Sequence, residues 1–568
     1  MRSLAITLCL LTTSLNAAQL TVRLEPRWQG HALKMHEASL MNAAGNQLSV
    51  TRLAMLVSHA QLQRVDGTWI GAKDWAAYLD AGKQRLSFTL NGLPPSQFTA
   101  LRFDLGLDDA TDHSDPAKRA VDDPLHPDVN GLHWGWRGGY VFLALEGLIS
   151  DGHGWSYHLA GQPCRGTIEV PADLDLRQDL VLTLAFEVDR VFASPHRIDI
   201  TQATSTHSRT DDPLAARLAD NAVQAFALLR VEPDLSVKTV DRNAIIQTPA
   251  LLTDRLPPHF PQALWPQDNP LTEAGVALGQ RLFQDPRLSI NNGQTCASCH
   301  EARHAFTDAR PFSLGAEGER GSRNAMPLFN LAWKPAFFWD GRAPTLREQV
   351  LQPIQDPHEM HETLDRVVRK IGDLAPLFEK AFGTPDITTE SLARALEQHL
   401  LSLISADSRM DRTLTKGERL TAQEQRGFEL FFTESDPGRG IRGGDCFHCH
   451  GGAHFTSNIF TNNGLDRVFI DEGRYRVTRR EEDRGKFIVP SLRNVALTAP
   501  YMHDGRFSTL EEVMEHYDHG LQPSATLDPN LAKHLPHGGL QLSAQDKAAL
   551  VAFLRTLTDE RLVQAQGL

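Results

Sequence analysis

The sequence predicts a multidomain protein in which an all-β, sandwich-like domain precedes a mainly α-helical region. Three observations predict this. Short β-prone runs fill residues 19–235, helix-period apolar patterns begin at residue 266, and a Pro-rich stretch over 236–265 separates them. At 568 residues the chain is too long for one hydrophobic core, so more than one domain is expected.

The composition is that of an ordinary globular protein. Hydrophobic residues make up 41% and charged residues 22% of the chain, and the net charge is −13. The basic footprint of a nucleic-acid-binding protein is missing from this composition, so no nucleic-acid partner is expected. After the N-terminal segment no apolar run is long enough to cross a bilayer, so no membrane span is predicted.

The N-terminus has the pattern of a secretory signal peptide, which is predicted over residues 1–18. Arg2 supplies the positive charge, Leu4–Leu15 form a short apolar stretch, and Ala17 and Ala18 suit cleavage. We therefore expect an exported, periplasmic protein.

Residues 19–235 are expected to form the all-β domain, because β-prone runs there alternate with turn-forming Gly, Asp, Asn and Pro. The runs are Leu20–Leu24, Thr51–Leu62, Arg85–Leu90, Ala100–Leu107, Tyr140–Glu146, Gly166–Val170 and Leu180–Val191. A long polar stretch, Asp108–Asn130, interrupts them and is predicted to be a functional or disordered loop. Residues 236–265 are predicted to be a linker that wraps onto the next domain.

From residue 266 the apolar residues recur with helical spacing. The predicted helices are Leu271–Phe283, Leu346–Ile354, Leu364–Phe382, Thr389–Ile404, Thr421–Phe432, Thr509–Tyr517 and Ala544–Leu557. Capping boxes are expected at several of their N-termini, formed by Thr421 with Glu424, Ser508 with Glu511, and Ser543 with Asp546.

The pattern Cys-x-x-Cys-His occurs twice in the helical region: at Cys296, Cys299 and His300, and at Cys446, Cys449 and His450. In such a motif the thiols add to the vinyl groups of haem and the histidine binds the iron. A zinc site or a disulfide is the alternative, but zinc would need further ligands and an exported protein can mature as a cytochrome. We therefore predict two covalent c-type haems in two cytochrome c-like lobes, residues 266–430 and 431–568.

The remaining cysteines do not form a disulfide framework. Cys9 lies in the signal segment, which leaves Cys164 alone in the mature chain. We predict that Cys164 is a buried structural thiol, with a reactive role or an intermolecular bridge as the alternative.

The ligand on the second face of each iron decides between electron transfer and reaction with peroxide. For the second haem, Met514 and Tyr517 lie on one face of a predicted helix and are candidates for the second iron ligand, as are Met502 and His516. The spacing alone does not decide which of them binds the iron. For the first haem, the loop Phe312–Met326 contains no histidine, which indicates an open iron face.

The second half of the chain resembles the bacterial di-haem cytochrome c peroxidase and MauG family. Besides the haem motifs, the matching segments are RNAMPLFN at Arg323–Asn330, FFWDGRAPTLREQVLQPIQDPHEM at Phe337–Met360, VPSLRNVALTAPYMHDG at Val489–Gly505 and TLEEVMEHY at Thr509–Tyr517. They stand in the order found in the family, and the resemblance implies that the first haem reacts with hydrogen peroxide.

The resemblance also implies roles for individual residues. Glu359 matches the distal acid that moves a proton between the oxygens of peroxide, and Gln349 and Pro353 match residues that line the same pocket. Trp339 matches the tryptophan between the haems, through which charge is shared. A calcium site between the lobes is implied as well, with carbonyl ligands from Asn324, Thr498 and Pro500.

Two departures from ordinary peroxidases are similar to MauG and its relative MbnH, which oxidise amino-acid side chains of a protein at a distance. Ala316 stands where many peroxidases carry a histidine that caps the first haem. Tyr517 stands where a methionine usually binds the second haem, with Met514 one turn earlier. A phenolate ligand lowers the reduction potential of the iron, so the resemblance implies an oxidase of protein side chains rather than a peroxidase that takes electrons from a donor protein.

Residues 20–205 resemble MbnP, a copper-binding family. The matching segments are VTRLAMLVSHAQL at Val50–Leu62, FDLGLDD at Phe103–Asp109, DDPLHPDVNGLHWGWRGGYVFLALEG at Asp122–Gly147 and SYHLAGQPC at Ser156–Cys164. The resemblance implies that a tryptophan, Trp134 or Trp136, is oxidised to kynurenine beside a copper site. Because copper favours imidazole, the expected ligands are His158 first and then His31 and His36; His126, His133 and His153 are also close in sequence.

These observations predict a peroxide-dependent di-haem oxidase that oxidises a tryptophan of its own copper-binding domain. One alternative is a conventional cytochrome c peroxidase that reduces hydrogen peroxide with electrons from a small redox protein. A second alternative is a copper-acquisition protein in which the haem half serves only to mature the copper site.

Overall fold

The computed structural model describes residues 18–71, 75–120, 123–134, 139–150, 152–206, 208, 212–234, 250–252, 255–263, 265–436 and 440–564. The predicted signal peptide, apart from Ala18, lies outside these ranges, and so do Trp136 and residues 236–249 of the predicted linker. No helix within the described part of the chain is long and apolar enough to cross a membrane.

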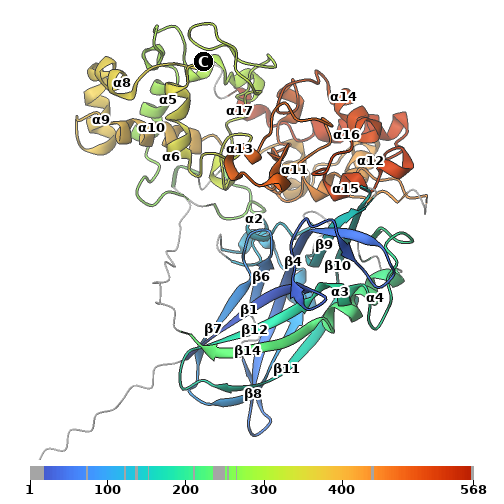
Figure 1. The fold of residues 1–568 in the computed structure, drawn as a ribbon. Coiled ribbons are helices and arrows are strands. Elements are labelled where there is room, and N and C mark those ends of the chain that lie inside the picture. Colours follow the sequence, from blue (N-terminus) through green and yellow to red (C-terminus); the bar gives the residue numbers. More distant parts are fainter. Residues whose placement is uncertain are drawn as a thin grey trace, which may run out of the picture.

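The N-terminal domain consists of β-sheets that enclose a shared hydrophobic core, as predicted (Figure 1). The first sheet has the order β14-β12-β1-β2, with β7 also paired to β1. Its strands are β1 (Ala18–Trp28), β2 (His31–Ala32), β7 (Ser87–Leu93), β12 (Leu180–Glu187) and β14 (Phe226–Pro233). Along β1 the apolar residues Leu20, Val22 and Leu24 alternate inward, which is the period-two pattern of a strand with one buried face.

The second sheet has the order β11-β8-β4-β9-β10-β13, with β3, β5 and β6 paired to β4. Its strands are β3 (Leu40–Met41), β4 (Gln47–Arg64), β5 (Trp69–Gly71), β6 (Ala76–Asp80), β8 (Gln97–Leu105), β9 (Val141–Ile149), β10 (Gly154–Ala160), β11 (Gly166–Asp175) and β13 (Ser205–Thr206). Every residue of β10 is buried. A strand buried on both faces needs a cover on each, and the second cover of β10 belongs to the helical region.

Several elements of this domain differ from the sequence predictions. The predicted strand Leu180–Val191 ends at Glu187 and continues as the short helix α3 (Val188–Val191). The predicted loop Asp108–Asn130 contains the short helices α1 (Asp109–Asp112) and α2 (Pro127–Asn130). Strands β10 and β14 and helix α4 (Pro213–Val223) were not predicted. Cys164 is buried, as expected, and its Sγ lies 3.4 Å from Ser208 Oγ.

The helical region contains two hydrophobic cores, one for each lobe. The first lobe contains α5 (Glu273–Phe283), α6 (Leu346–Gln349), α7 (Gln352–Gln355), α8 (Leu364–Lys370), α9 (Ala375–Phe382) and α10 (Thr389–Leu401). The second contains α11 (Arg409–Lys416), α12 (Ala422–Phe431), α14 (Leu510–Glu515), α15 (Pro529–Ala532) and α16 (Ala544–Arg555). Met410 and Leu430 belong to the core of the second lobe, so α11 and α12 pack there although the predicted boundary lies after residue 430.

Two segments from outside the first lobe pack into its core. Phe260 and Trp265, from the end of the predicted linker, pack into the first lobe's core, which agrees with a linker that wraps onto the next domain. After α16 the chain returns through α17 (Glu560–Gln564), whose Leu562 joins the same core.

The predicted helices are shortened where the sequence contains helix breakers. The stretch Leu364–Phe382 is broken by a 3₁₀ turn at Gly372–Leu374 and restarts with Pro376 in the first turn of α9. Capping boxes form at Thr421 and Ser543 as predicted. The third box uses Thr509 with Glu512 rather than Ser508 with Glu511, because α14 begins one residue later than expected.

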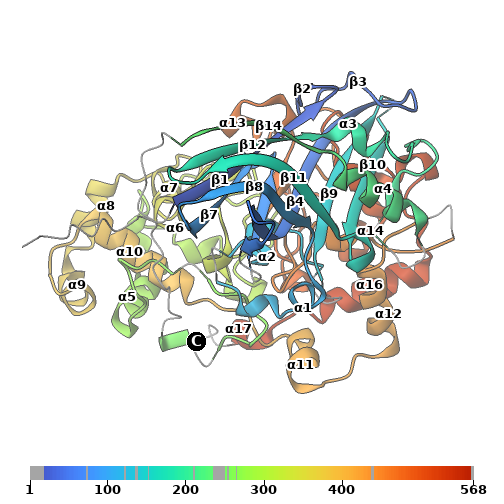
Figure 2. The same ribbon diagram turned by 90° about the horizontal axis from the view of Figure 1, so that it is seen from below.

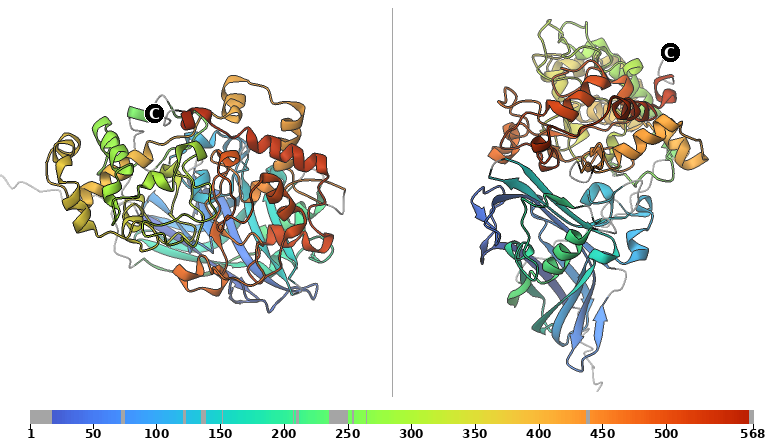
Figure 3. Two further views of the ribbon diagram at one scale, coloured as in Figure 1. Left: turned by 90° about the horizontal axis from the view of Figure 1, so that it is seen from above. Right: turned by 90° about the vertical axis from the view of Figure 1, so that its right-hand side faces the viewer.

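The β domain lies against the second lobe. Strands β9 and β10 contact α15, and the views in Figures 1 and 3 both place the sheets directly beneath the helical region. Figure 2, seen from below, shows the sheets largely in front of the second lobe, while α5, α8, α9 and α10 of the first lobe lie to the left of them. The two halves therefore form one body with a shared interface.

Candidate functional site: two haem motifs and the domain interface

The first haem motif is held in a 3₁₀ turn, Cys296–Ser298, that places both thiols on one side of the chain. Nδ1–H of His300 donates to the Phe306 carbonyl over 2.8 Å, which fixes the ring and leaves Nε2 for the iron. Burial lowers the pKa of His300, which favours the neutral imidazole that metals bind. These residues fit a covalently attached haem.

A carboxyl group lies near the first motif, as the sequence predicts. Glu359 follows α7 and interacts electrostatically with both Cys296 and Cys299. Burial, followed by the nearby Asp356, raises the pKa of Glu359 to about 7. A carboxyl group with this pKa can both accept and release a proton near neutral pH.

The loop that contains Ala316 lies against the backbone of Glu359. The Ala316 N–H donates to the Glu359 carbonyl over 2.6 Å, and a methyl side chain offers no ligand for iron. Gln349 ends α6 and Pro353 lies in α7, and both are half-buried. The backbone contact therefore brings the predicted open face and the predicted acid together.

The second haem motif opens into a largely apolar cavity. Cys446, Cys449 and His450 line it. Nδ1–H of His450 donates to the Phe455 carbonyl over 3.2 Å, so Nε2 is again left for iron. Thiols, a positioned imidazole and an apolar cavity together fit a c-type haem.

Several candidates for the second iron ligand line this cavity. Tyr517, Met514 and Met502 are all among its lining residues. His516 turns elsewhere, because its Nε2–H donates to the Asn463 carbonyl over 2.9 Å and its ring packs against Phe507.

Tyr517 lies in a π-helical turn, residues 516–520, that follows α14. Such a wide turn inserts an extra residue into a helix and is frequent at functional sites, because it redirects a side chain. Burial raises the pKa of the Tyr517 phenol, so a phenolate there needs a cation such as iron to stabilise it.

Tyr517→Phe is expected to change the absorption and electron paramagnetic resonance spectra of the second haem, because the predicted oxygen ligand is removed without loss of ring packing. Met514→Leu, a substitution of similar volume in the same cavity, is the control and should leave both spectra unchanged. The reverse pattern would assign the ligand to Met514.

Trp339, the predicted bridging tryptophan, lies at the second haem site. It is 9% exposed, lines the second cavity, and its Nε1–H donates to the Asn324 carbonyl over 2.8 Å. Asn324, Thr498 and Pro500 line the same cavity. The structure therefore brings the predicted bridging tryptophan together with the residues predicted to bind calcium.

The predicted tryptophan segment of the β domain reaches the second lobe. Trp134 is half-buried against the β core, and its backbone N–H donates to the Gly139 carbonyl over 3.0 Å. A Cβ built on Gly451, the residue directly after His450, would lie 3.9 Å from the carbonyl oxygen of His133. The backbone next to Trp134 thus meets the backbone next to the predicted iron ligand.

The predicted copper ligands do not come together. His158 is buried, with Nε2 2.8 Å from Glu146 Oε1. Burial, followed by Lys486, lowers the pKa of His36 to about 4, whereas His31 is exposed on β2. Within the described ranges, groups of three close His, Cys, Asp or Glu ligands occur at Glu434–Asp445–His448 and at Glu515–Asp518–His519, and neither contains a predicted copper ligand.

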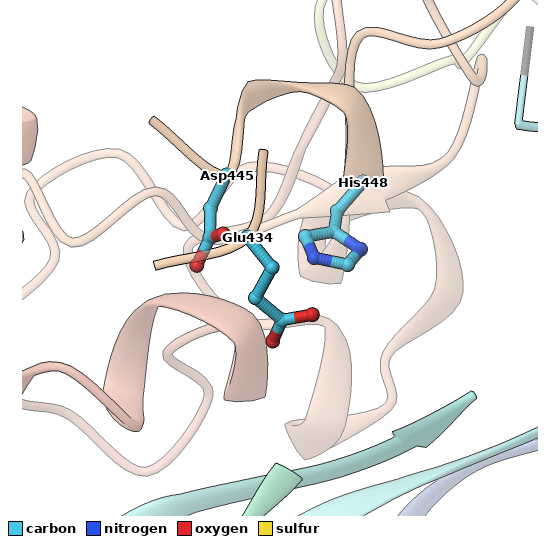
Figure 4. A group of neighbouring side chains, drawn as sticks. All are labelled: Glu434, Asp445 and His448. Atoms are coloured by element: carbon cyan, nitrogen blue, oxygen red, sulfur yellow. The ribbon is translucent and has the colours of Figure 1, made fainter. Parts of the chain in front are cut away.

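The first of these groups was missed from the sequence. Figure 4 shows Glu434, Asp445 and His448 gathered in the second lobe. Lys533 contacts both carboxylates, with Nζ 3.2 Å from Asp445, so an ammonium already supplies the positive charge there. His448 is one of the two residues between the cysteines of the second haem motif, and the sequence gave no indication of where its side chain points.

Comparisons with known proteins agree with both halves of this description. A family model described as di-haem cytochrome c peroxidase matches residues 273–419, and the MbnP family model matches residues 17–208. The methylamine utilization protein MauG of Methylorubrum extorquens is 34% identical over 52% of this chain and 81% of that protein. Cytochrome c551 peroxidase of Nitrosomonas europaea is 30% identical over 58% of this chain and 91% of that protein.

Among solved structures, a MauG-like protein associated with microbial copper homeostasis is similar to this chain. It is 35% identical, with a TM-score of 0.50, over 54% of this chain and 96% of that chain. The similarity covers the haem half, while the N-terminal half is matched by the MbnP family model.

Proposed function

Because the chain belongs to the di-haem cytochrome c peroxidase and MauG family, we propose that it is a peroxide-dependent oxidase whose substrate is a tryptophan of its own N-terminal domain. When bound, the two c-type haems would supply redox-active iron. Glu359 would take a proton from one oxygen of hydrogen peroxide and deliver it to the other, which makes that oxygen a better leaving group. Gln349 and Pro353 would line the peroxide pocket, and Trp339 would connect the two haem sites.

The observation that carries the proposal is the contact between the tryptophan segment and the second haem motif. The carbonyl of His133 lies next to Gly451, so Trp134 is one residue from a backbone contact with the chain that holds His450. A substrate residue held at the enzyme's own haem motif has no diffusion step and little orientational entropy to lose.

The proposed reaction converts tryptophan to kynurenine. Two molecules of hydrogen peroxide oxidise the indole to N-formylkynurenine and are reduced to water, and hydrolysis then releases formate. The resulting aniline nitrogen, with imidazole from His158, His31 or His36, would suit copper. We also place calcium at Asn324, Thr498 and Pro500, and the protein in the periplasm.

The test is the mass of the tryptophan peptide, residues 134–137, from protein that carries both haems, before and after peroxide. We expect a gain of two oxygens with a loss of carbon monoxide, and the variants Trp134→Phe and Trp136→Phe identify which residue carries it. Trp69→Phe, on β5 elsewhere in the same domain, is the control that should retain the modification. An unmodified peptide in the wild-type holo-protein would contradict the proposal.

A conventional peroxidase is the second candidate, and one observation favours it. Met514 and Met502 both line the second haem cavity, and a thioether ligand suits electron transfer from a small redox protein. Peroxide reduction that depends on such a donor, with an unmodified tryptophan peptide, would select this function.

A further inference from the structure

The β domain and the second haem lobe approach each other closely at the level of the backbone. Strands β9 and β10 lie against α15. A Cβ added to Gly154, the first residue of β10, would lie 2.1 Å from the Pro529 carbonyl oxygen and 2.8 Å from the backbone nitrogen of Lys533. Only glycine allows this approach, so the interface is a fitted contact rather than a loose association of domains.

The second lobe supplies a hydrogen-bond partner for a buried carboxylate of the β domain, that of Glu146. Glu146 Oε1 accepts from Arg52 Nη1 and His158 Nε2, each over 2.8 Å, and Asn530 Nδ2 lies 3.4 Å from Oε2. Glu146, His158 and Asn530 are all at most 5% exposed. A buried carboxylate oxygen is costly without a partner, so separating or tilting the two halves, which removes Asn530 from Oε2, is disfavoured.

The same junction reaches the second haem motif. The rings of His158 and His448 are 5.2 Å apart, and His448 lies between the two cysteines of that motif. Glu434 and Asp445 also lie close to His448 (Figure 4), and Lys533 forms ion pairs with both carboxylates. The β domain therefore lies beside the second haem motif at His448 and beside Gly451, the residue that follows the motif.

We infer that the tryptophan is oxidised within its own chain, and that Glu146 is the positioning residue that holds the β domain on the second haem lobe. The inference rests on the proposed function and specifies its substrate. The electrons leave the indole of the same chain, hydrogen peroxide accepts them, and water supplies the hydrolysis step described above.

A mixing experiment separates reaction within a chain from reaction between chains. One holo-protein carries Glu359→Gln with its tryptophans intact and is labelled with ¹⁵N. The second is active but carries Trp134→Phe and Trp136→Phe. After addition of peroxide to the mixture, we expect the labelled tryptophan peptide to stay unmodified.

Modification of the labelled peptide at a rate near that of the wild type would overturn the inference. In the wild type alone, the modified fraction at a fixed time should not depend on protein concentration. If the wild type is not modified at all, the proposed function fails instead, so the two failures are distinguishable.

Two interface variants test the positioning role. Glu146→Gln and Gly154→Val should each lower the rate of tryptophan modification, by about 100-fold for a shift of roughly 1 Å. Both should leave the haem spectra and peroxide consumption with a small-molecule reductant unchanged. Gly372→Ala, where an added Cβ would meet nothing within 4 Å, is the control. Wild-type modification rates in both interface variants would contradict the role of this junction.

Discussion

Replacing Glu359 by glutamine is expected to lower the rate of peroxide-dependent tryptophan oxidation by about 10²–10⁴-fold, the usual contribution of a positioned general acid–base group. Glutamine preserves the size of the side chain but cannot accept a proton from peroxide. The contact between the Ala316 N–H and the residue 359 carbonyl involves only backbone atoms, so the loop should keep its position. The measurement is the rate at which the tryptophan peptide changes mass in holo-protein after addition of peroxide.

The pH dependence of the same rate provides a second readout. Burial raises the pKa of Glu359 to about 7, so the group is mainly protonated below this pH and mainly ionised above it. Because only the carboxylate can accept the first proton, the wild-type rate should rise as the pH increases through about 7. This rise should be absent from Glu359→Gln and present in Glu379→Gln, a control at an exposed position of α9. A rate that falls through the same pH range would show that the protonated form is required.

The parts of the site that rest on short local patterns could be predicted from sequence. Both haem motifs occupy five consecutive residues, and their chemistry needs no knowledge of the fold. Glu359 was predicted by the resemblance of its segment, and the structure adds the burial that raises its pKa. For Tyr517 the regular helical spacing was insufficient, because the turn that carries it is π-helical and does not follow the 3.6-residue period.

The contacts between the two halves could not be predicted. Glu146 and Asn530 are 384 residues apart, and no local pattern relates them. One signal was present in the run VFLALEGLI, where Glu146 is a single charge in an otherwise apolar strand. A buried charge requires a partner, but the sequence does not say that the partners are Arg52, His158 and a residue of the second lobe.

Of the substitutions proposed for this protein, removal of the buried Arg493 guanidinium is expected to lower the free energy of unfolding most. Arg493 is 1% exposed and donates to both oxygens of Asp411 over 2.8 Å, which places two charges in the core between α11 and the haem loop. Arg493→Met leaves the Asp411 carboxylate without this partner, and breaking such a pair costs about 3–5 kcal/mol. In a thermal denaturation of the holo-protein, the midpoint should fall by on the order of 10 °C.

Two controls separate the charge effect from loss of packing. The double variant Arg493→Met with Asp411→Leu should recover much of the midpoint, because no charge then remains buried without a partner. Arg555→Met removes an exposed ion pair with Glu511 and should change the midpoint little. A double variant as unstable as Arg493→Met would assign the effect to packing instead.

The same substitution should also affect the second haem before the protein unfolds. The Arg493 guanidinium donates to the carbonyl of Ala453 over 2.7 Å, and Ala453 lies three residues after His450. It also lies over the ring of Phe260, 4.6 Å from the centroid, so it connects the segment before the first lobe to this loop. We therefore expect the spectrum of the second haem to change at temperatures below the midpoint in Arg493→Met, while the spectrum of the first haem stays constant. Simultaneous changes in both haems would mean that Arg493 stabilises the helical region as a whole and not the loop that holds His450.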